Sequence, residues 1–330
     1  MKLSYAQNLE DYHLELMFGD VRNGTYVDVG GGHPVADNVT FWFYLKGWRG
    51  LIVEPQAALA DAYRHIRPRD IVYKGLAGAA DGETDFHAVV GLHGLSSMNK
   101  DAAERAKEFG AEFRTERAPV RRLDGLMTEH ALPRVDILKI DVEGAEDQVL
   151  AGVDLTRHQP RVIVVESVNP GNLDAQPGAW EQPLLAAGYR FAFFDNLNRF
   201  YVAPDSRDLA KRLPEKPAAW NAVDHLWDHG RAPSNPAHAD HDLAIILAHG
   251  LMAMLPALGP DMLRHAVETG LMARKIKPES DDAKTALLGK AEYPGLAPVP
   301  ADLPALLASD QFRAALGRIA CFYDGGHIVE

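Results

Sequence analysis

The sequence has little cysteine and few basic residues, and both shortages exclude classes of protein. Cys321 is the one cysteine among 330 residues, so neither an intramolecular disulfide nor a cysteine-rich zinc site can form. Acidic residues outnumber lysine and arginine by 46 to 34, for a formal net charge of -12. The densest basic runs, residues 114–122 and 274–277, are interrupted by acidic or apolar residues. Because such a chain repels polyphosphate, we expect no nucleic-acid partner.

Long hydrophobic runs are also missing. The most apolar stretch, residues 244–258, is interrupted by His249 and Pro256, so we expect no membrane span. The first residues reach Glu10 and Asp11 without an apolar segment of signal-peptide length. These features together predict a cytoplasmic protein.

Strand-like and helix-like segments alternate over the first two thirds of the chain. Apolar, β-branched runs typical of buried parallel strands occupy residues 25–29, 49–53, 70–75, 135–140 and 161–165. Helical patterns occupy residues 6–18, 39–46, 57–66, 102–109, 146–150 and 183–187, and further strands are expected at 84–90 and 119–123. Asn196-Leu197-Asn198 between two apolar runs indicates a hairpin. We predict an α/β fold with a Rossmann-like class I methyltransferase sheet, mostly parallel with a terminal antiparallel hairpin.

Glycines follow the first predicted strand, in Asp28-Val29-Gly30-Gly31-Gly32-His33. Glycine lets the backbone approach a ligand closely, and the next helix presents polarised N–H groups. A glycine turn between a strand and a helix can equally be only a turn. Val35 stands where the last glycine of a G-x-G-x-x-G frame would be, which favours a ligand without a pyrophosphate.

Glu54 ends the second predicted strand, where an acid commonly accepts hydrogen bonds from ribose hydroxyls. The alternative is a solvent-facing acid at a strand end. Together with the glycine loop, Glu54 predicts a nucleoside-containing cofactor.

Two carboxylates, Asp141 and Glu143, follow the strand at residues 135–140. Ligands bind at the carboxyl ends of such strands, so we expect Asp141 near the reacting atoms, as a base or as a group that orients the substrate. Glu143, Glu166 and His33 are the further catalytic candidates. We interpret Glu146 and Asp147 as favourable charges at a helix N-terminus.

Over about residues 4–203 the sequence resembles the FkbM family of methyltransferases. The resemblance is carried, in consecutive order, by Ser4-Tyr5-Ala6-Gln7-Asn8-Leu9-Glu10-Asp11, Tyr26-Val27-Asp28-Val29-Gly30, His33-Pro34, Asn38-Val39-Thr40, Gly47-Trp48-Arg49-Gly50, Val53-Glu54-Pro55, Leu95-Ser96-Ser97, Lys139-Ile140-Asp141-Val142-Glu143-Gly144 and Val164-Val165-Glu166. Gly31-Gly32 replaces the alanine and asparagine usual in the family's glycine turn. The resemblance implies an S-adenosylmethionine-dependent O-methyltransferase that acts on a hydroxyl of a sugar, a glycan or a polyketide.

We assign one set of residues to cofactor binding and another to catalysis, and Asp141 belongs to both sets. The cofactor set is Gln7, Asp28, Gly30, Gly32, Glu54, Pro55 and Asp141. Gln7, Glu10 and Asp11 fall at i, i+3 and i+4, so we expect them to share one helix face. Such a polar face is usually solvated, but the match to the family's opening implies that it lines the site. Ser96 and Ser97 either close over a ligand or belong to a flexible loop.

A divalent metal is an alternative that we do not favour. Oxygen ligands from Asp141, Glu166 and Asn169 would suit magnesium. His225 and His229 lie one helical turn apart, but no carboxylate spacing completes a known metal pattern, and surface or capping histidines are the preferred interpretation.

Composition changes after residue 204. We predict a methyltransferase domain at residues 1–204 and a helical C-terminal extension at 205–330. Two apolar helix stripes are expected in the extension, and each must pack against another apolar surface, either the catalytic domain or a second copy of the chain in a homodimer. They comprise Leu243, Ile246, Leu247 and Leu251, and Met262, Leu263, Ala266 and Leu271. The expected partner is a small-molecule or glycan acceptor. The alternatives are a nicotinamide-dependent oxidoreductase and a non-catalytic module of a biosynthetic complex.

Overall fold

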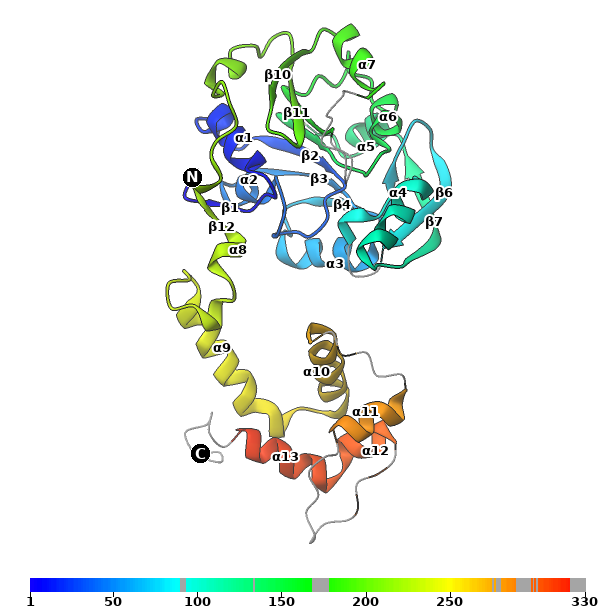
Figure 1. Ribbon diagram of the computed structural model, residues 1–330, viewed down its shortest axis with the longest axis vertical. Helices are drawn as coiled ribbons and strands as arrows, with labels where there is room; N and C mark the ends of the chain where they lie inside the picture. Colours follow the sequence, from blue (N-terminus) through cyan, green and yellow to red (C-terminus); the bar gives the residue numbers. More distant parts are fainter. Residues whose placement is uncertain are drawn as a thin grey trace. The chain divides into compact units, whose positions relative to one another are not determined.

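A computed structural model describes residues 1–89, 93–132, 134–167, 178–274, 276, 280–288, 298, 300 and 302–320. The chain divides into two compact units, Met1–Asp228 and His229–Glu330. Figure 1 shows the strands gathered in the first unit and a set of helices in the second.

A seven-stranded sheet forms the centre of the first unit. Its strands are β2 (Thr25–Val29), β3 (Arg49–Val53), β4 (Ile71–Tyr73), β8 (Ile137–Ile140), β9 (Val162–Glu166), β10 (Arg190–Phe194) and β11 (Asn198–Val202), in the order β10-β11-β9-β8-β2-β3-β4. β11 runs antiparallel to both of its neighbours, and the other paired strands are parallel. The predicted α/β class with a mostly parallel sheet is confirmed, and β10 and β11 form the expected hairpin.

Helices cover both faces of this sheet (Figure 1). One face packs against α1 (Glu10–Phe18), α2 (Phe41–Leu45) and α3 (Ala57–Ile66). The other packs against α5 (Leu123–Glu129), α6 (Glu146–Ala151) and α7 (Glu181–Ala186). Successive strand residues alternate between the two cores, so the strands are apolar on both sides, as expected for a sheet buried on both faces.

A smaller sheet of β5 (Leu76–Ala77), β7 (Phe113–Arg121) and β6 (Gly82–Val89) lies beside the helix α4 (Lys100–Arg105). β6 and β7 pair antiparallel, from Gly82 with Val120 to Val89 with Phe113. The strand expected at residues 119–123 is β7, which begins earlier, at Phe113, and ends at Arg121. It is longer at its start because β6 pairs with it as far as Phe113. Leu123 instead begins α5.

The first unit continues past the boundary that composition suggested at residue 204. β1 (Leu3–Ser4) pairs parallel with β12 (Asp224–His225), and Arg212 donates hydrogen bonds to the carboxylate of Asp20 and to the carbonyl of Met17. Residues 205–228 thus return to the N-terminal helix, which places them in the first unit.

The second unit is helical in its described part, with α9 (His241–Met254), α10 (Pro260–Ala273), α11 (Asp281–Leu288), α12 (Leu303–Ala308) and α13 (Asp310–Ala320). Leu303, Leu306 and Leu307 form its small core. The stripe Leu243, Ile246, Leu247 and Leu251 on α9 is more than half exposed, whereas Leu263 and Leu271 on α10 are buried. None of the described helices has the length and apolar character needed to cross a membrane.

Candidate active site

Strand register gathers charged residues on one face of the sheet. In the ladder between β2 and β8, Asp28 lies opposite Lys139, and in the ladder between β8 and β9, Ile140 lies opposite Val165. Since side chains alternate along a strand, Asp141 and Glu166 continue the face on which Lys139 lies. The sequence therefore brings these acids together at the carboxyl ends of the central strands.

A cavity of about 510 Å³ opens at this edge of the sheet. Nine of the ten predicted site residues line it: Gln7, Gly30, Gly32, His33, Glu54, Pro55, Asp141, Glu143 and Glu166. Asp28 is the exception, because its side chain is buried beneath the cavity, where its Oδ2 accepts a hydrogen bond of 2.7 Å from the Thr40 hydroxyl.

The glycine loop follows β2 and is held tightly against the neighbouring strands. Gly30 has a φ of 75°, and a Cβ there would lie 1.8 Å from the carbonyl oxygen of Asp141. Because the two backbones cross so closely here, only glycine, which has no Cβ, fits at position 30. Gly32 also has a positive φ, of 59°, but a Cβ there would meet no atom within 4 Å. The backbone at Gly32 is thus open for a ligand to approach.

Glu54 is buried at the end of β3 and braces the glycine loop. Its Oε2 accepts a hydrogen bond of 2.9 Å from the backbone N–H of Gly32, and its Oε1 accepts one of 2.8 Å from Gln56. Each carboxylate oxygen keeps further acceptor capacity after one such bond. Burial raises the pKa of Glu54 to about 7, although the two backbone hydrogen bonds act in the opposite direction.

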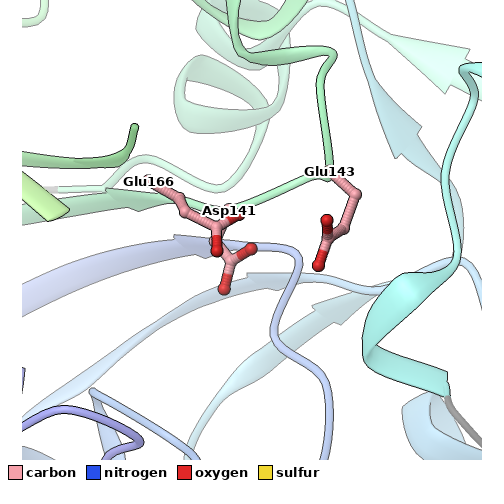
Figure 2. Close-up of side chains that lie close together, drawn as sticks. All are labelled: Asp141, Glu143 and Glu166. Carbon is pink, nitrogen blue, oxygen red and sulfur yellow. The ribbon is translucent and has the colours of Figure 1, made fainter. Parts of the chain in front are cut away.

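Three carboxylates meet at one part of the cavity wall. Figure 2 shows Asp141 and Glu166 extending from neighbouring strand ends and Glu143 from the loop that follows β8. One oxygen from each lies within 4.8 Å of the others. Oxygens at this spacing could hold a divalent cation, but Asn169, the third ligand that the magnesium alternative requires, lies outside the described residues.

Two of the three carboxylates, Glu143 and Glu166, have raised pKa values. Burial, followed by the charges of Asp141 and Glu146, raises the pKa of Glu143 to about 8. Burial and the charges of Asp141 and Glu143 raise the pKa of Glu166 well above its ordinary value, and a hydrogen bond to Asp141 adds to the effect. These environments favour the neutral forms of Glu143 and Glu166.

The loop after β8 has an uncommon backbone conformation, which hydrogen bonds to neighbouring side chains hold in place. Glu143 adopts a φ of 55°, which is uncommon for a residue with a side chain. The Glu146 carboxylate accepts hydrogen bonds from the N–H groups of Val142 and Gly144, and the Ser97 hydroxyl donates one of 2.8 Å to the carbonyl of Glu143. Glu146 thus holds the loop at the start of α6, and Ser97 anchors the loop at residues 93–99 to the acidic cluster.

His33 has a defined tautomer. Its Nδ1 accepts hydrogen bonds from the backbone N–H groups of Val35 and Ala36, so the proton of the neutral ring lies on Nε2. A ring in this tautomer can donate a hydrogen bond at Nε2 but cannot take up a proton there. Among the candidate bases, this geometry favours the carboxylates over His33.

The predicted shared face of Gln7, Glu10 and Asp11 is wrong. Leu9 adopts a left-handed conformation with a φ of 64°, so α1 begins only at Glu10 and Gln7 lies outside it. Gln7 lines the cavity. Glu10 and Asp11 are instead buried: Asp11 accepts hydrogen bonds from Ser4 and Tyr5 within the N-terminal segment, and Glu10 accepts one from Asn198 of the β10–β11 hairpin.

His225 has a structural role. It is buried, its Nε2 lies 2.7 Å from the carbonyl oxygen of Trp220, and its ring stacks on the indole of Trp220. His225 is thus a buried residue that contacts Trp220, rather than the expected surface histidine.

Sequence reasoning missed two parts of the site. Lys139 lines the cavity. The feature of the sequence that could have pointed to it is that it is a charged residue within an apolar strand. Leu76, Phe86 and Met98 form an apolar side of the cavity, contributed by the small sheet and the loop after it. These residues carry no motif, because their common position depends on how the small sheet lies against the large one.

Comparison with known families agrees with this geometry. Residues 28–191 match the model of the methyltransferase FkbM domain, a range that spans the glycine loop, Glu54 and the acidic cluster and ends at the start of β10. The chain belongs to the FkbM methyltransferase family. Searches of curated proteins and of solved structures found no match. The FkbM domain supports methyl transfer as the activity of the first unit.

Proposed function

We propose that this FkbM protein is an S-adenosylmethionine-dependent O-methyltransferase that acts on a hydroxyl of a sugar or glycan. The observation that carries the proposal is the single cavity that joins the glycine loop and Glu54 to three clustered carboxylates. The strand order, with β11 alone antiparallel, supports the class I methyltransferase layout of the Rossmann-like fold.

The residues around the cavity fit this cofactor. The open backbone at Gly32 leaves room for the methionine end, and Glu54 can accept hydrogen bonds from ribose hydroxyls. Leu76, Phe86 and Met98 offer an apolar surface for adenine. S-adenosylmethionine supplies, when bound, a methyl group on a positively charged sulfur, and the acidic end of the cavity complements that charge.

In such a reaction, the residues of this chain would orient the acceptor and accept its proton. Asp141 stands at the end of the central strand, with its side chain about one third exposed to the cavity. The acceptor hydroxyl would lose its proton to a carboxylate oxygen of Asp141 while its oxygen gains the methyl carbon. Glu143 and Glu166, whose pKa values are raised, can donate hydrogen bonds to the acceptor in their protonated forms.

Labelled methyl transfer tests the proposal. The full chain is incubated with S-adenosylmethionine that carries a labelled methyl group and with a panel of methyl glycosides, oligosaccharides and sugar nucleotides. We expect labelled methyl ether in at least one acceptor, and loss of that product with Asp141→Asn. Transfer to nitrogen or to carboxylate acceptors alone would contradict the assignment of a hydroxyl.

We further propose that the second unit contributes to a homodimer. The observation behind this is the α9 stripe, in which each of the four apolar side chains is at least 55% exposed. Light scattering on the full chain tests it: we expect two subunits, and fewer after Ile246→Asp. A monomeric full chain would contradict the homodimer.

A further inference from the structure

The carbonyl oxygen of Gly31, in the glycine loop, accepts hydrogen bonds from two buried side chains. The Tyr63 hydroxyl donates to it at 2.7 Å, and the side-chain amide of Asn38 donates to it at 2.9 Å. The Asn38 amide also donates to the Tyr63 hydroxyl at 2.7 Å. Tyr63 is fully buried and Asn38 almost so, and neither is among the residues that line the cavity. Two donors outside the cavity therefore hold one carbonyl group of the loop.

The orientation of the Asn38 amide is fixed by its oxygen. Its Oδ1 accepts a hydrogen bond of 2.9 Å from the guanidinium of Arg67 and one of 3.1 Å from the backbone N–H of Thr40. A guanidinium can only donate hydrogen bonds, so the amide oxygen faces Arg67 and the amide nitrogen faces Gly31. Asn38 is thus held as a donor to the loop.

The same peptide unit presents its N–H to Glu54. The peptide bond between Gly31 and Gly32 is trans, so its carbonyl and its N–H point in opposite directions. The N–H of Gly32 donates a hydrogen bond of 2.9 Å to Oε2 of Glu54, which lines the cavity. Tyr63 and Asn38 therefore hold one side of the peptide unit, and Glu54 holds the other.

Glycine on both sides makes this peptide unit easy to rotate. Rotation changes ψ of Gly31 and φ of Gly32, and neither residue has a Cβ that would oppose the change. It would turn the Gly31 carbonyl towards the Glu54 carboxylate, so that two acceptors would face each other. Gly31 also has to lack a side chain for Tyr63 to reach it, because a Cβ there would lie 2.7 Å from the Tyr63 hydroxyl. The hydrogen bonds to the carbonyl therefore favour the observed orientation of a peptide unit that is otherwise free to turn.

We propose that Tyr63 is a positioning residue for the cofactor: together with Asn38 it fixes the Gly31–Gly32 peptide unit, so that the N–H of Gly32 holds Glu54 in place for the ribose hydroxyls. Tyr63 does this from outside the cavity, without contact to the ligand. The inference deepens the proposed function and rests on it for the identity of the ligand.

Selective isotope labelling reports on this peptide unit in the ligand-free full chain. When glycine alone carries ¹³C at its carbonyl and ¹⁵N at its amide, a carbonyl–nitrogen correlation arises only where glycine follows glycine, at residues 30–31, 31–32 and 325–326. Gly32→Ala and Gly326→Ala identify two of the three signals by their loss. We expect hydrogen exchange of the Gly32 amide to become roughly threefold to tenfold faster in Tyr63→Phe, because exchange follows the population of the open form. An unchanged exchange rate would overturn the proposal.

Calorimetry measures the consequence for S-adenosylmethionine. Loss of one net hydrogen bond in Tyr63→Phe should raise the Kd roughly threefold to tenfold. Asn38→Asp should raise it further, because a carboxylate oxygen then faces the Gly31 carbonyl while the other oxygen still accepts from Arg67. Wild-type affinity in either folded variant would also overturn the proposal.

Tyr189→Phe is the matched control. Tyr189 is buried, and its hydroxyl donates a hydrogen bond of 2.8 Å to the carbonyl oxygen of Pro160, away from the residues that line the cavity. Because both variants lose the same kind of bond, urea denaturation should show a similar loss of stability in each. Gly32 exchange and the Kd should change in Tyr63→Phe alone, and an equal rise of the Kd in Tyr189→Phe would contradict positioning.

The two measurements separate this inference from the proposed function. A wild-type chain that binds no S-adenosylmethionine, but whose Gly32 exchange responds to Tyr63→Phe and not to Tyr189→Phe, would contradict the proposed function. It would leave the hold of Tyr63 on the glycine loop intact.

Discussion

The side-chain amide of Asn38 donates a hydrogen bond of 2.9 Å to the carbonyl oxygen of Gly31, in the middle of the glycine loop. Asn38 is in turn held by Arg67, whose guanidinium donates to its Oδ1 at 2.9 Å. Arg67 is fully buried and also pairs with Asp70 at 2.8 Å. A buried polar network beneath the sheet edge therefore supports the loop that we assign to the cofactor.

Arg67→Met should destabilise the first unit strongly. Removing one member of a buried ion pair leaves the other charge uncompensated, at a cost of about 3–5 kcal/mol in the free energy of unfolding. Urea denaturation measures the loss, and Arg67→Met/Asp70→Asn should recover part of it. Arg64→Met is the control, because Arg64 is exposed and should change stability by less than about 0.5 kcal/mol. Equal effects of Arg64→Met and Arg67→Met would refute the role of the network.

Glu54→Gln should weaken the binding of S-adenosylmethionine. An amide can accept through only one atom, so either the Gly32 or the Gln56 N–H loses its acceptor. Hydrogen bonds to a charged group contribute about 1.5–3 kcal/mol, which corresponds to a roughly tenfold to hundredfold higher Kd. Calorimetry compares this variant with Glu83→Gln, an exposed glutamate outside the cavity. Unchanged affinity in Glu54→Gln would remove Glu54 from the cofactor site.

Asp141→Asn should abolish most methyl transfer while leaving the fold intact. Loss of a general base typically lowers the rate by about 10²–10⁴-fold, and asparagine keeps the shape of the side chain. Turnover is measured on whichever acceptor of the panel is methylated, and circular dichroism checks the fold. Turnover within a fewfold of wild type would show that another group takes the proton.

Glu10→Gln should make stability less dependent on pH. Burial, followed by the charge of Asp195, raises the pKa of Glu10 to about 8, from an ordinary value near 4.5. Between these values the folded chain holds a proton that the unfolded chain lacks, so this group's contribution to stability falls as pH rises from about 4.5 to 8. Glutamine removes that contribution.

The measurement is the free energy of unfolding at several pH values from 5 to 8.5, in wild type, Glu10→Gln and the exposed control Glu83→Gln. The advantage of Glu10→Gln over wild type should grow with pH, whereas Glu83→Gln should follow wild type. A difference between Glu10→Gln and wild type that stays constant over this range would show that Glu10 is ionised in the folded chain.

Local patterns predicted the sheet well because its strands are buried on both faces. β2, β3 and α3 begin and end where the apolar patterns placed them, at residues 25–29, 49–53 and 57–66. The start of α1 was wrong because the left-handed conformation of Leu9 depends on tertiary contacts rather than on helical pattern. The first compact unit extends beyond residue 204, to Asp228, and composition does not reveal this because it does not show that β12 pairs with β1.

The candidate site was predictable only where residues stand in motifs. Glycines and acids at or just after strand ends identified six of the residues that line the cavity: Gly30, Gly32, Glu54, Asp141, Glu143 and Glu166. Lys139 was not singled out, because its role depends on the register that places it opposite Asp28 on a neighbouring strand. Asp28 was assigned to the cofactor because it stands in the motif, whereas its carboxylate lies beneath the cavity with Thr40 and Lys139.

Calorimetric titration of the full chain with S-adenosylmethionine, and in parallel with NADH, tests the central claim most directly. The glycine loop, Glu54 and the acidic cluster around one cavity predict saturable binding of S-adenosylmethionine at one site per chain, and no response to NADH. Tight binding of NADH without any response to S-adenosylmethionine would contradict the account and favour an oxidoreductase.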